Sequence, residues 1–128
     1  MAATLQIKKL IESLLQFEYP VEQWKEVYKE IPPNHICPTV ATVTRAHVIN
    51  ILERYIKKEL NEDDISVWAG VVFTMMGRPV ILEPGYTNAL ANELEYLNHA
   101  DDGDFSPELA QRTIGILKNL NYDPNSME

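Results

Sequence analysis

The sequence lacks several features that define whole classes of protein. Its single cysteine, Cys37, has no partner for an internal disulfide. Its longest apolar run, Val67 to Phe73 with Gly70 included, is far too short to cross a bilayer. The N-terminus also lacks the basic-then-apolar order of a secretory signal. Together these absences predict a cytoplasmic protein with no membrane contact.

Basic residues are nearly missing from one half of the chain. Residues 59–108 contain eleven acids and a single base, Arg78, whereas the whole chain has a net charge of −8. Such a half repels phosphate backbones, which argues against nucleic acid as a partner. It attracts a basic protein and speeds the encounter, unless the acids serve only solubility.

Catalytic and metal-binding patterns are missing as well. The chain has no nucleophile elbow, phosphate-binding loop or zinc-helix motif. His35 and Cys37 have no second pair of zinc ligands nearby, and the acids around Gly103 lack the spacing of a calcium loop. Glu93 and Glu95 are two residues apart on a predicted helix, so they point in different directions and form no catalytic dyad. We therefore predict a non-enzymatic protein without a metal or a cofactor.

What the chain does contain is helical periodicity. A length of 128 residues is typical of one domain. Apolar residues recur at three- and four-residue spacing in most segments, which indicates amphipathic helices. We predict an all-α fold, a single compact bundle of about six helices, with a polar tail from about residue 121. The predicted outer helices are 4–18, 20–31, 44–60, 86–97 and a last one that begins at Ser106-Pro107 and runs to about residue 120.

The predicted central helix covers about residues 62–76. Asn61 is a suitable N-cap, Asp64 can complete a capping box, and Gly77 suits the end of a helix. The segment between them is apolar nearly all round, which is typical of a helix buried at the centre of a bundle. Within it, we expect Trp68 to have a structural role.

Two segments are predicted to be irregular. Residues 34–43 read as a loop held by Ile36 and Val40. Val80 to Leu82 reads as an extended apolar connector lying across helices, too short to build a sheet by itself. Between them, Arg78 either pairs with an acid (Asp63, Asp64 or Glu83) and positions its loop, which is the interpretation we prefer, or binds an anion.

Four features of residues 62–120 suggest a relationship to a known group of proteins. They are an acid-capped helix containing Trp68-Ala69, a loop with Arg78 followed by Ile81 and Glu83, a helix ending in Leu97-Asn98, and the helix start Phe105-Ser106-Pro107-Glu108. In these features the chain resembles small acidic helical bacterial immunity proteins of toxin systems such as contact-dependent growth inhibition. The resemblance implies a binding function rather than an enzyme activity. Pro79-Val80 departs from the pattern, in which acids would follow the loop arginine.

Charge and resemblance together predict an immunity protein that neutralises a basic, nuclease-like toxin domain by direct binding. Its acids would occupy the surface with which a nuclease grips phosphates. The alternative is a scaffold or adaptor that binds a partner helix in an apolar groove, with Met75 and Met76 as adaptable lining. The predicted partner-binding residues are Asp63, Asp64, Glu83, Glu93, Glu95, Asp101, Asp102 and Asp104.

Overall fold

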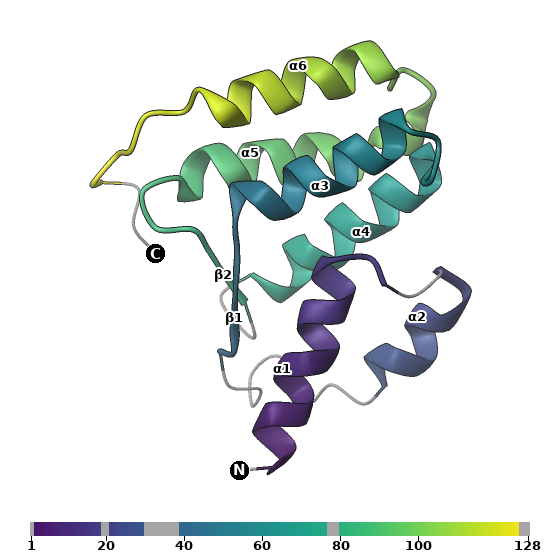
Figure 1. Cartoon of the computed structure of the whole chain (residues 1–128), viewed down its shortest axis with the longest axis vertical. Helices are drawn as coiled ribbons and strands as arrows, with labels where there is room; N and C mark the ends of the chain where they lie inside the picture. Colours follow the sequence, from purple (N-terminus) through teal and green to yellow (C-terminus); the bar gives the residue numbers. More distant parts are fainter. Residues whose placement is uncertain (1, 19–20, 30–38, 77–79, 126–128) are drawn as a thin grey trace.

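The computed structural model describes residues 2–18, 21–29, 39–76 and 80–125. These residues are mostly helical, which confirms the predicted all-α class. In Figure 1, α3, α5 and α6 occupy the upper half of the molecule, α4 crosses below them, and α1 and α2 lie at the bottom. The helices are α1 (Ala2–Leu15), α2 (Val21–Tyr28), α3 (Arg45–Ile56), α4 (Glu62–Met75), α5 (Thr87–Asn98), the 3₁₀ helix η1 (Ala100–Asp102) and α6 (Pro107–Lys118).

The predicted helices are found, and several end earlier than expected. Helix α1 stops at Leu15, where Phe17 has a positive φ of 55° and turns the chain. Helix α3 ends at Ile56 rather than near residue 60, because Lys58 has a φ of 68° that no helix can contain. Apolar periodicity therefore locates these helices well, whereas single residues in the left-handed conformation set their ends.

Helix α4 is the central helix, as predicted, but it is not buried all round. The capping box at its start is confirmed: the Asp64 N–H donates to Asn61 Oδ1, and the Asn61 N–H donates to Asp64 Oδ2, both at 2.9 Å. The helix packs mainly on α5 and also contacts η1, α3 and α1. On its outer side, Phe73 is 39% exposed and Thr74 is exposed too. The prediction of a fully buried helix is therefore wrong for this face.

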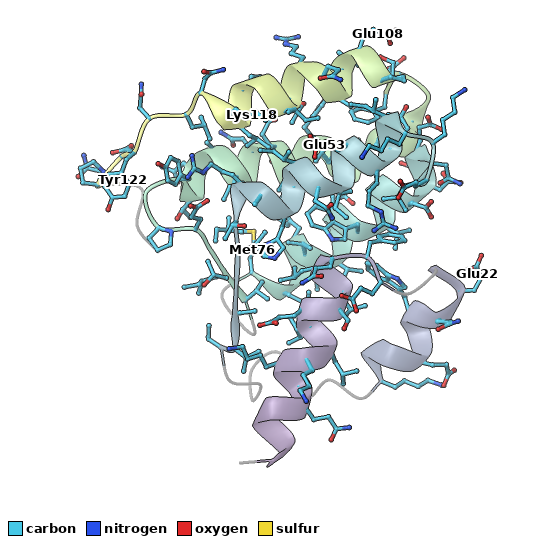
Figure 2. All side chains as sticks on the ribbon, in the orientation of Figure 1. Glu22, Glu53, Met76, Glu108, Lys118 and Tyr122 are labelled. Atoms are coloured by element: carbon cyan, nitrogen blue, oxygen red, sulfur yellow. The ribbon has the colours of Figure 1, made fainter. Side chains whose placement is uncertain are left out.

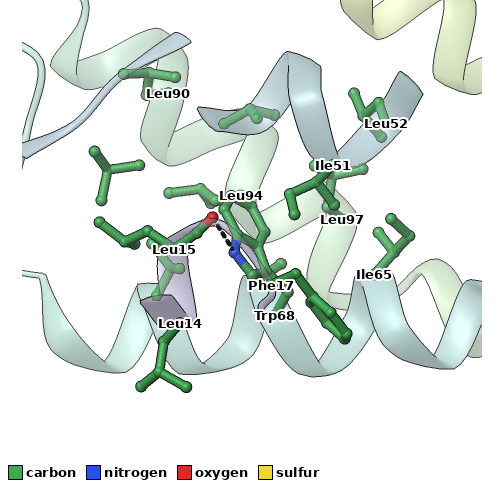
Figure 3. Close-up of a cluster of buried hydrophobic side chains, with 14 of the residues drawn as sticks. Leu14, Leu15, Phe17, Ile51, Leu52, Ile65, Trp68, Leu90, Leu94 and Leu97 are labelled. Carbon is green, nitrogen blue, oxygen red and sulfur yellow. Dashed lines mark hydrogen bonds between the residues drawn. The ribbon is translucent and has the colours of Figure 1, made fainter. Parts of the chain in front are cut away.

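Trp68 connects the N-terminal helix to this centre. Its side chain is fully buried, and its indole N–H donates to the Leu15 carbonyl oxygen at 3.0 Å. Figure 3 shows this bond inside a cluster of leucine and isoleucine side chains. Because the bond satisfies an unpaired carbonyl at the end of α1, Trp68 has the structural role that its position predicted.

A short parallel sheet replaces the two irregular segments. Strand β1 (Ala41–Val43) pairs with β2 (Val80–Leu82), with Ala41 opposite Val80 and Val43 opposite Leu82. The Glu83 N–H extends the ladder by donating to the Val43 carbonyl oxygen at 2.9 Å. The prediction of a loop is wrong for residues 41–43, which form β1. The extended segment predicted at 80–82 is confirmed, and β1 supplies the partner that it needs to form a sheet.

The tail after α6 is held to the body of the protein through residue 123. The Asp123 N–H donates to the Gly85 carbonyl oxygen at 2.9 Å. The ring of Tyr122 packs edge-on against Tyr86, with 5.9 Å between the ring centroids. A frayed tail from residue 121 is therefore not what the structure shows as far as these contacts extend.

Candidate functional site

Two connections between helices meet at one end of the bundle, on the right in Figure 1: the link from α3 to α4, and the link from α5 through η1 to α6. Ser66 on α4 donates its hydroxyl to the Asn98 carbonyl oxygen at 2.7 Å, which joins the start of α4 to the end of α5. The Tyr55 ring of α3 lies 5.1 Å from the ring of Phe105, which joins the end of α3 to the segment before α6. The segments at this end carry the acids Glu59, Glu62, Asp63, Asp64, Asp101, Asp102, Asp104 and Glu108, of which Figure 2 labels Glu108 at the start of α6. These eight residues are called the acidic end below.

The η1 segment presents three of these acids outward. Ala100 is buried and fixes the segment to the core, whereas Asp101, Asp102 and Asp104 are exposed. Within the described residues, one weak contact with a basic group involves these three acids: Asp102 lies 3.7 Å from the ring nitrogen of His99, and both side chains are largely exposed. These carboxylates are thus available to a partner.

The acids at the start of α4 are partly engaged within the protein. Asp64 caps the helix through its own carboxylate, whereas Asp63 is exposed. Glu62 accepts a hydrogen bond of 2.6 Å from the Tyr55 hydroxyl. Burial and this bond raise the pKa of Tyr55, so the phenol stays a donor. Asp63 is therefore the most available carboxylate of this turn.

Few cations offset the acidic end. Lys57 and Lys58 are exposed, and Lys58 lines a cavity together with Glu59, Glu62 and Asp64. Arg54 reaches Glu59 at 3.2 Å. Eight carboxylates thus face two free-standing ammonium groups and one arginine already held by Glu59 and by the Gln16 and Phe17 carbonyls. The potential at this end of the bundle is negative.

Aromatic rings add a second property to the acidic end. Tyr96 and Phe105 pack edge-on, with centroids 6.0 Å apart, and line a cavity of about 170 Å³ together with His99, Asp102 and Asp104. Ring faces beside carboxylates attract ammonium and guanidinium groups. This arrangement can bind a basic side chain.

Glu83 lies at the other end of α5 and is engaged within the chain. Its carboxylate accepts from the Arg45 side chain at 3.0 and 3.2 Å and from the Arg45 backbone N–H at 3.0 Å. Partial burial alone would raise the pKa of Glu83, but the bonds and charge of Arg45 outweigh it and hold the pKa below its usual value. Arg45 also stacks on the Tyr86 ring, 3.7 Å from its centroid. Glu83 is therefore a scaffold residue rather than a free anion.

Glu93 and Glu95 lie on α5, outside the segments that form the acidic end. Glu95 is exposed, whereas Glu93 turns toward α6 and is half-buried. Burial raises the pKa of Glu93, and the charge of Arg112 only partly opposes the effect. Of the eight predicted partner-binding acids, five (Asp63, Asp64, Asp101, Asp102 and Asp104) come together, and Glu83, Glu93 and Glu95 do not join them.

Sequence reasoning missed Arg45 as the partner of Glu83. Arg78, the single base of residues 59–108, was predicted to pair with Asp63, Asp64 or Glu83. The observed partners Arg45 and Glu83 are 38 positions apart, and no local spacing links them. Outside the described residues lie Arg78 itself, Gly77, Ile36, His35 and Cys37.

In the described part of the chain, no helix combines the length and the apolar character needed to cross a bilayer. No group of three or more His, Cys, Asp or Glu side chains lies there in an arrangement suited to a metal ion. Comparison of the chain with protein-family models, curated proteins and solved structures found no match.

Proposed function

We propose that this chain is a non-enzymatic immunity protein that neutralises a toxin by docking its acidic end on the toxin's basic surface. The observation that supports this proposal is the gathering of eight carboxylates, drawn from sequence positions 59–108, at a single end of the bundle. A nuclease-type toxin must be positively charged where it grips phosphates. The positive surface of the toxin attracts the acidic end, and the docked carboxylates then repel the phosphates of the nucleic-acid substrate.

Self-repulsion among these acids supports a binding role over a purely solubilising one. Charges that serve only solubility can be spread over a surface, where they repel one another least. Here Asp101, Asp102 and Asp104 fall within four positions and are exposed. Clustering of this kind costs stability in the free protein and is offset when a basic partner binds.

The test is charge reversal with a matched control. The variant D101K/D102K/D104K should lose binding to the basic nuclease-type toxin domain that the wild type neutralises, and cells that carry it should no longer survive that toxin. The control E18K/E22K/E26K makes the same charge change at exposed acids of the N-terminal segment and should keep both properties. Raising NaCl from about 50 to about 300 mM should weaken wild-type binding by at least about tenfold, mainly through the association rate. Equal binding by both variants, or no protection by the wild type, would refute the proposal.

The adaptor alternative has less support. It assigned Met75 and Met76 to the lining of a groove, but the Met75 side chain is completely buried in the core. Met76 is only partly buried and packs against the same core. Binding that does not change with salt is the result that would favour this alternative.

A further inference from the structure

A groove between α5 and α6 lies next to the acidic end and differs from it in character. The groove has a volume of about 300 Å³ and is lined by Glu93, Tyr96, Leu109, Arg112, Thr113 and Ile116. Tyr96 also lines the smaller cavity of the acidic end, so the two sites share one wall. The groove and the acidic end are therefore neighbours on the surface.

One oxygen of Glu93 is left unsatisfied in this groove. Glu93 Oε2 is buried and has no hydrogen-bond partner among the described residues. The charge of Arg112 is close enough to oppose the rise in the Glu93 pKa, but Arg112 makes no hydrogen bond to this oxygen. Because a buried carboxylate oxygen without a donor destabilises the free protein, the groove is suited to a ligand that brings a donor.

The walls of the groove show which kind of donor fits. Tyr96 and Ile116 are large apolar side chains that remain 43% and 41% exposed. A lysine side chain has an apolar stem of four methylenes that would lie between such walls, and a compact ammonium group that suits a single carboxylate oxygen. An arginine fork is better matched by both oxygens of a carboxylate, whereas only Oε2 is both buried and unsatisfied here.

We propose that this groove receives one lysine side chain of the basic partner, with its stem packed between Tyr96 and Ile116. Its ammonium group donates to the Glu93 carboxylate once that side chain turns Oε2 from its buried position into the groove. The inference rests on the proposed function. It adds one defined pocket to a surface that otherwise binds its partner through long-range electrostatic attraction. The acidic end attracts the partner over a distance, whereas the groove is filled only when the partner's lysine is aligned with it.

The groove can be tested without the partner. The probe is N-acetyl-lysine methylamide, added at millimolar concentrations to ¹⁵N-labelled protein while amide chemical shifts are recorded. The control probe is N-acetyl-norleucine methylamide, which has the same aliphatic stem but no ammonium group. We expect the lysine probe, and not the norleucine probe, to shift the amide signals of Tyr96, Thr113 and Ile116. Equal shifts from the two probes, or none at the groove, would overturn the proposal.

Two variants on the same helix separate the pocket from general charge. E93Q removes the acceptor charge in the groove, and E95Q removes an exposed charge two residues away. The apparent affinity for the lysine probe should fall at least fivefold in E93Q and should not change in E95Q. Tighter binding of N-acetyl-arginine methylamide by the wild type would overturn the assignment to lysine.

The two proposals can fail separately. Groove shifts that behave as expected, in a protein that does not bind or neutralise the toxin, would refute the proposed function alone. Salt-sensitive toxin binding that D101K/D102K/D104K abolishes, combined with no effect of E93Q on either probe or toxin, would refute the groove alone.

Discussion

The guanidinium group of Arg45 and the carboxylate of Glu83 hold together two segments that are 38 residues apart in the sequence. Arg45 opens α3 directly after β1, and Glu83 follows β2. Their hydrogen bonds thus close the end of the two-stranded sheet and fix the direction in which α3 leaves it. The side chains are only 28% and 23% exposed, so this pair is better shielded than an ordinary surface ion pair.

We expect Glu83→Gln to lower the free energy of unfolding at pH 7 by about 1–2 kcal/mol, because it weakens charge-assisted bonds to Arg45. The pKa of Glu83 is held below its ordinary value of 4.5. A depressed carboxyl pKa contributes stability above 4.5 that is lost as pH falls through the folded value. Urea unfolding of wild type and variant should therefore converge in acid. Glu95→Gln, at an exposed site on α5, is the control and should change stability by less than about 0.5 kcal/mol.

His47 should make the protein less stable in mild acid. Its Nδ1 atom accepts the Thr44 N–H at 3.0 Å and completes the capping box of α3. Burial lowers the pKa of His47 below 6.5, so the unfolded chain takes up a proton more readily. Stability is therefore complete above pH 6.5 and declines as pH falls through this value. His47→Gln keeps an acceptor at this position and should remove the decline, worth about 1 kcal/mol between pH 7 and pH 5. An identical pH dependence of unfolding in both proteins would contradict this account.

Trp68→Phe should be among the most damaging conservative substitutions. It removes the donor to the Leu15 carbonyl oxygen and leaves space in a fully buried site. We expect a loss of about 2–4 kcal/mol in the free energy of unfolding, measured by urea denaturation. Phe73→Leu, on the exposed face of the same helix, should cost less than about 1 kcal/mol. Similar losses of unfolding free energy in the two variants would contradict the finding that Trp68 lies on the buried face of α4 and Phe73 on its exposed face.

Local signals were sufficient to predict the helices and their caps. Thr44, Asn61 and Ser106 each accept a hydrogen bond from the backbone three residues later, which their side chains and positions indicated. The sheet was not predictable, since β1 and β2 are three residues each and only their mutual pairing makes them strands. Nothing within either segment identifies the other.

Gly85 and Gly115 should respond oppositely to alanine. Gly85 has a φ of 88°, and a Cβ atom there would collide with the ring of Tyr122. Gly85→Ala should therefore cost about 2 kcal/mol, through both backbone strain and loss of the docked tail. Gly115 lies in α6 with nothing within 4 Å of an added Cβ, so Gly115→Ala should stabilise by about 0.5–1 kcal/mol. In thermal unfolding, the melting temperature of Gly85→Ala should lie below that of the wild type, and that of Gly115→Ala above it.

Salt should stabilise the free protein. Repulsion within the acidic end is screened as ionic strength rises, so the melting temperature should increase between about 20 and about 200 mM NaCl. The variant D101N/D102N/D104N should melt at a higher temperature than the wild type in low salt and should respond less to added NaCl. The E18Q/E22Q/E26Q variant serves as the matched control. A wild type that is insensitive to salt would show that the clustered acids do not repel one another appreciably.

The candidate site was only partly predictable for a similar reason. The excess of acids in residues 59–108 is visible in the sequence, and helix starts account for the positions of Asp63 and Glu108. Which acids stay free depends on contacts from distant segments. Glu83 is taken up by Arg45, and Glu93 is turned into the groove beside α6. The groove itself belongs to two helices, so no single segment indicates it.

The packing of α3 against α6 has a consequence for synthesis of the protein. Helix α3 leaves the ribosome early, but the helix that covers it begins only at Pro107. Until then α3, whose Val48, Ile51 and Leu52 are fully buried in the finished molecule, lacks one of the helices that pack on it. A chain whose synthesis stops before α6 therefore exposes apolar side chains of α3, which chaperones and proteases can bind. Truncated chains should therefore be degraded faster than the complete protein.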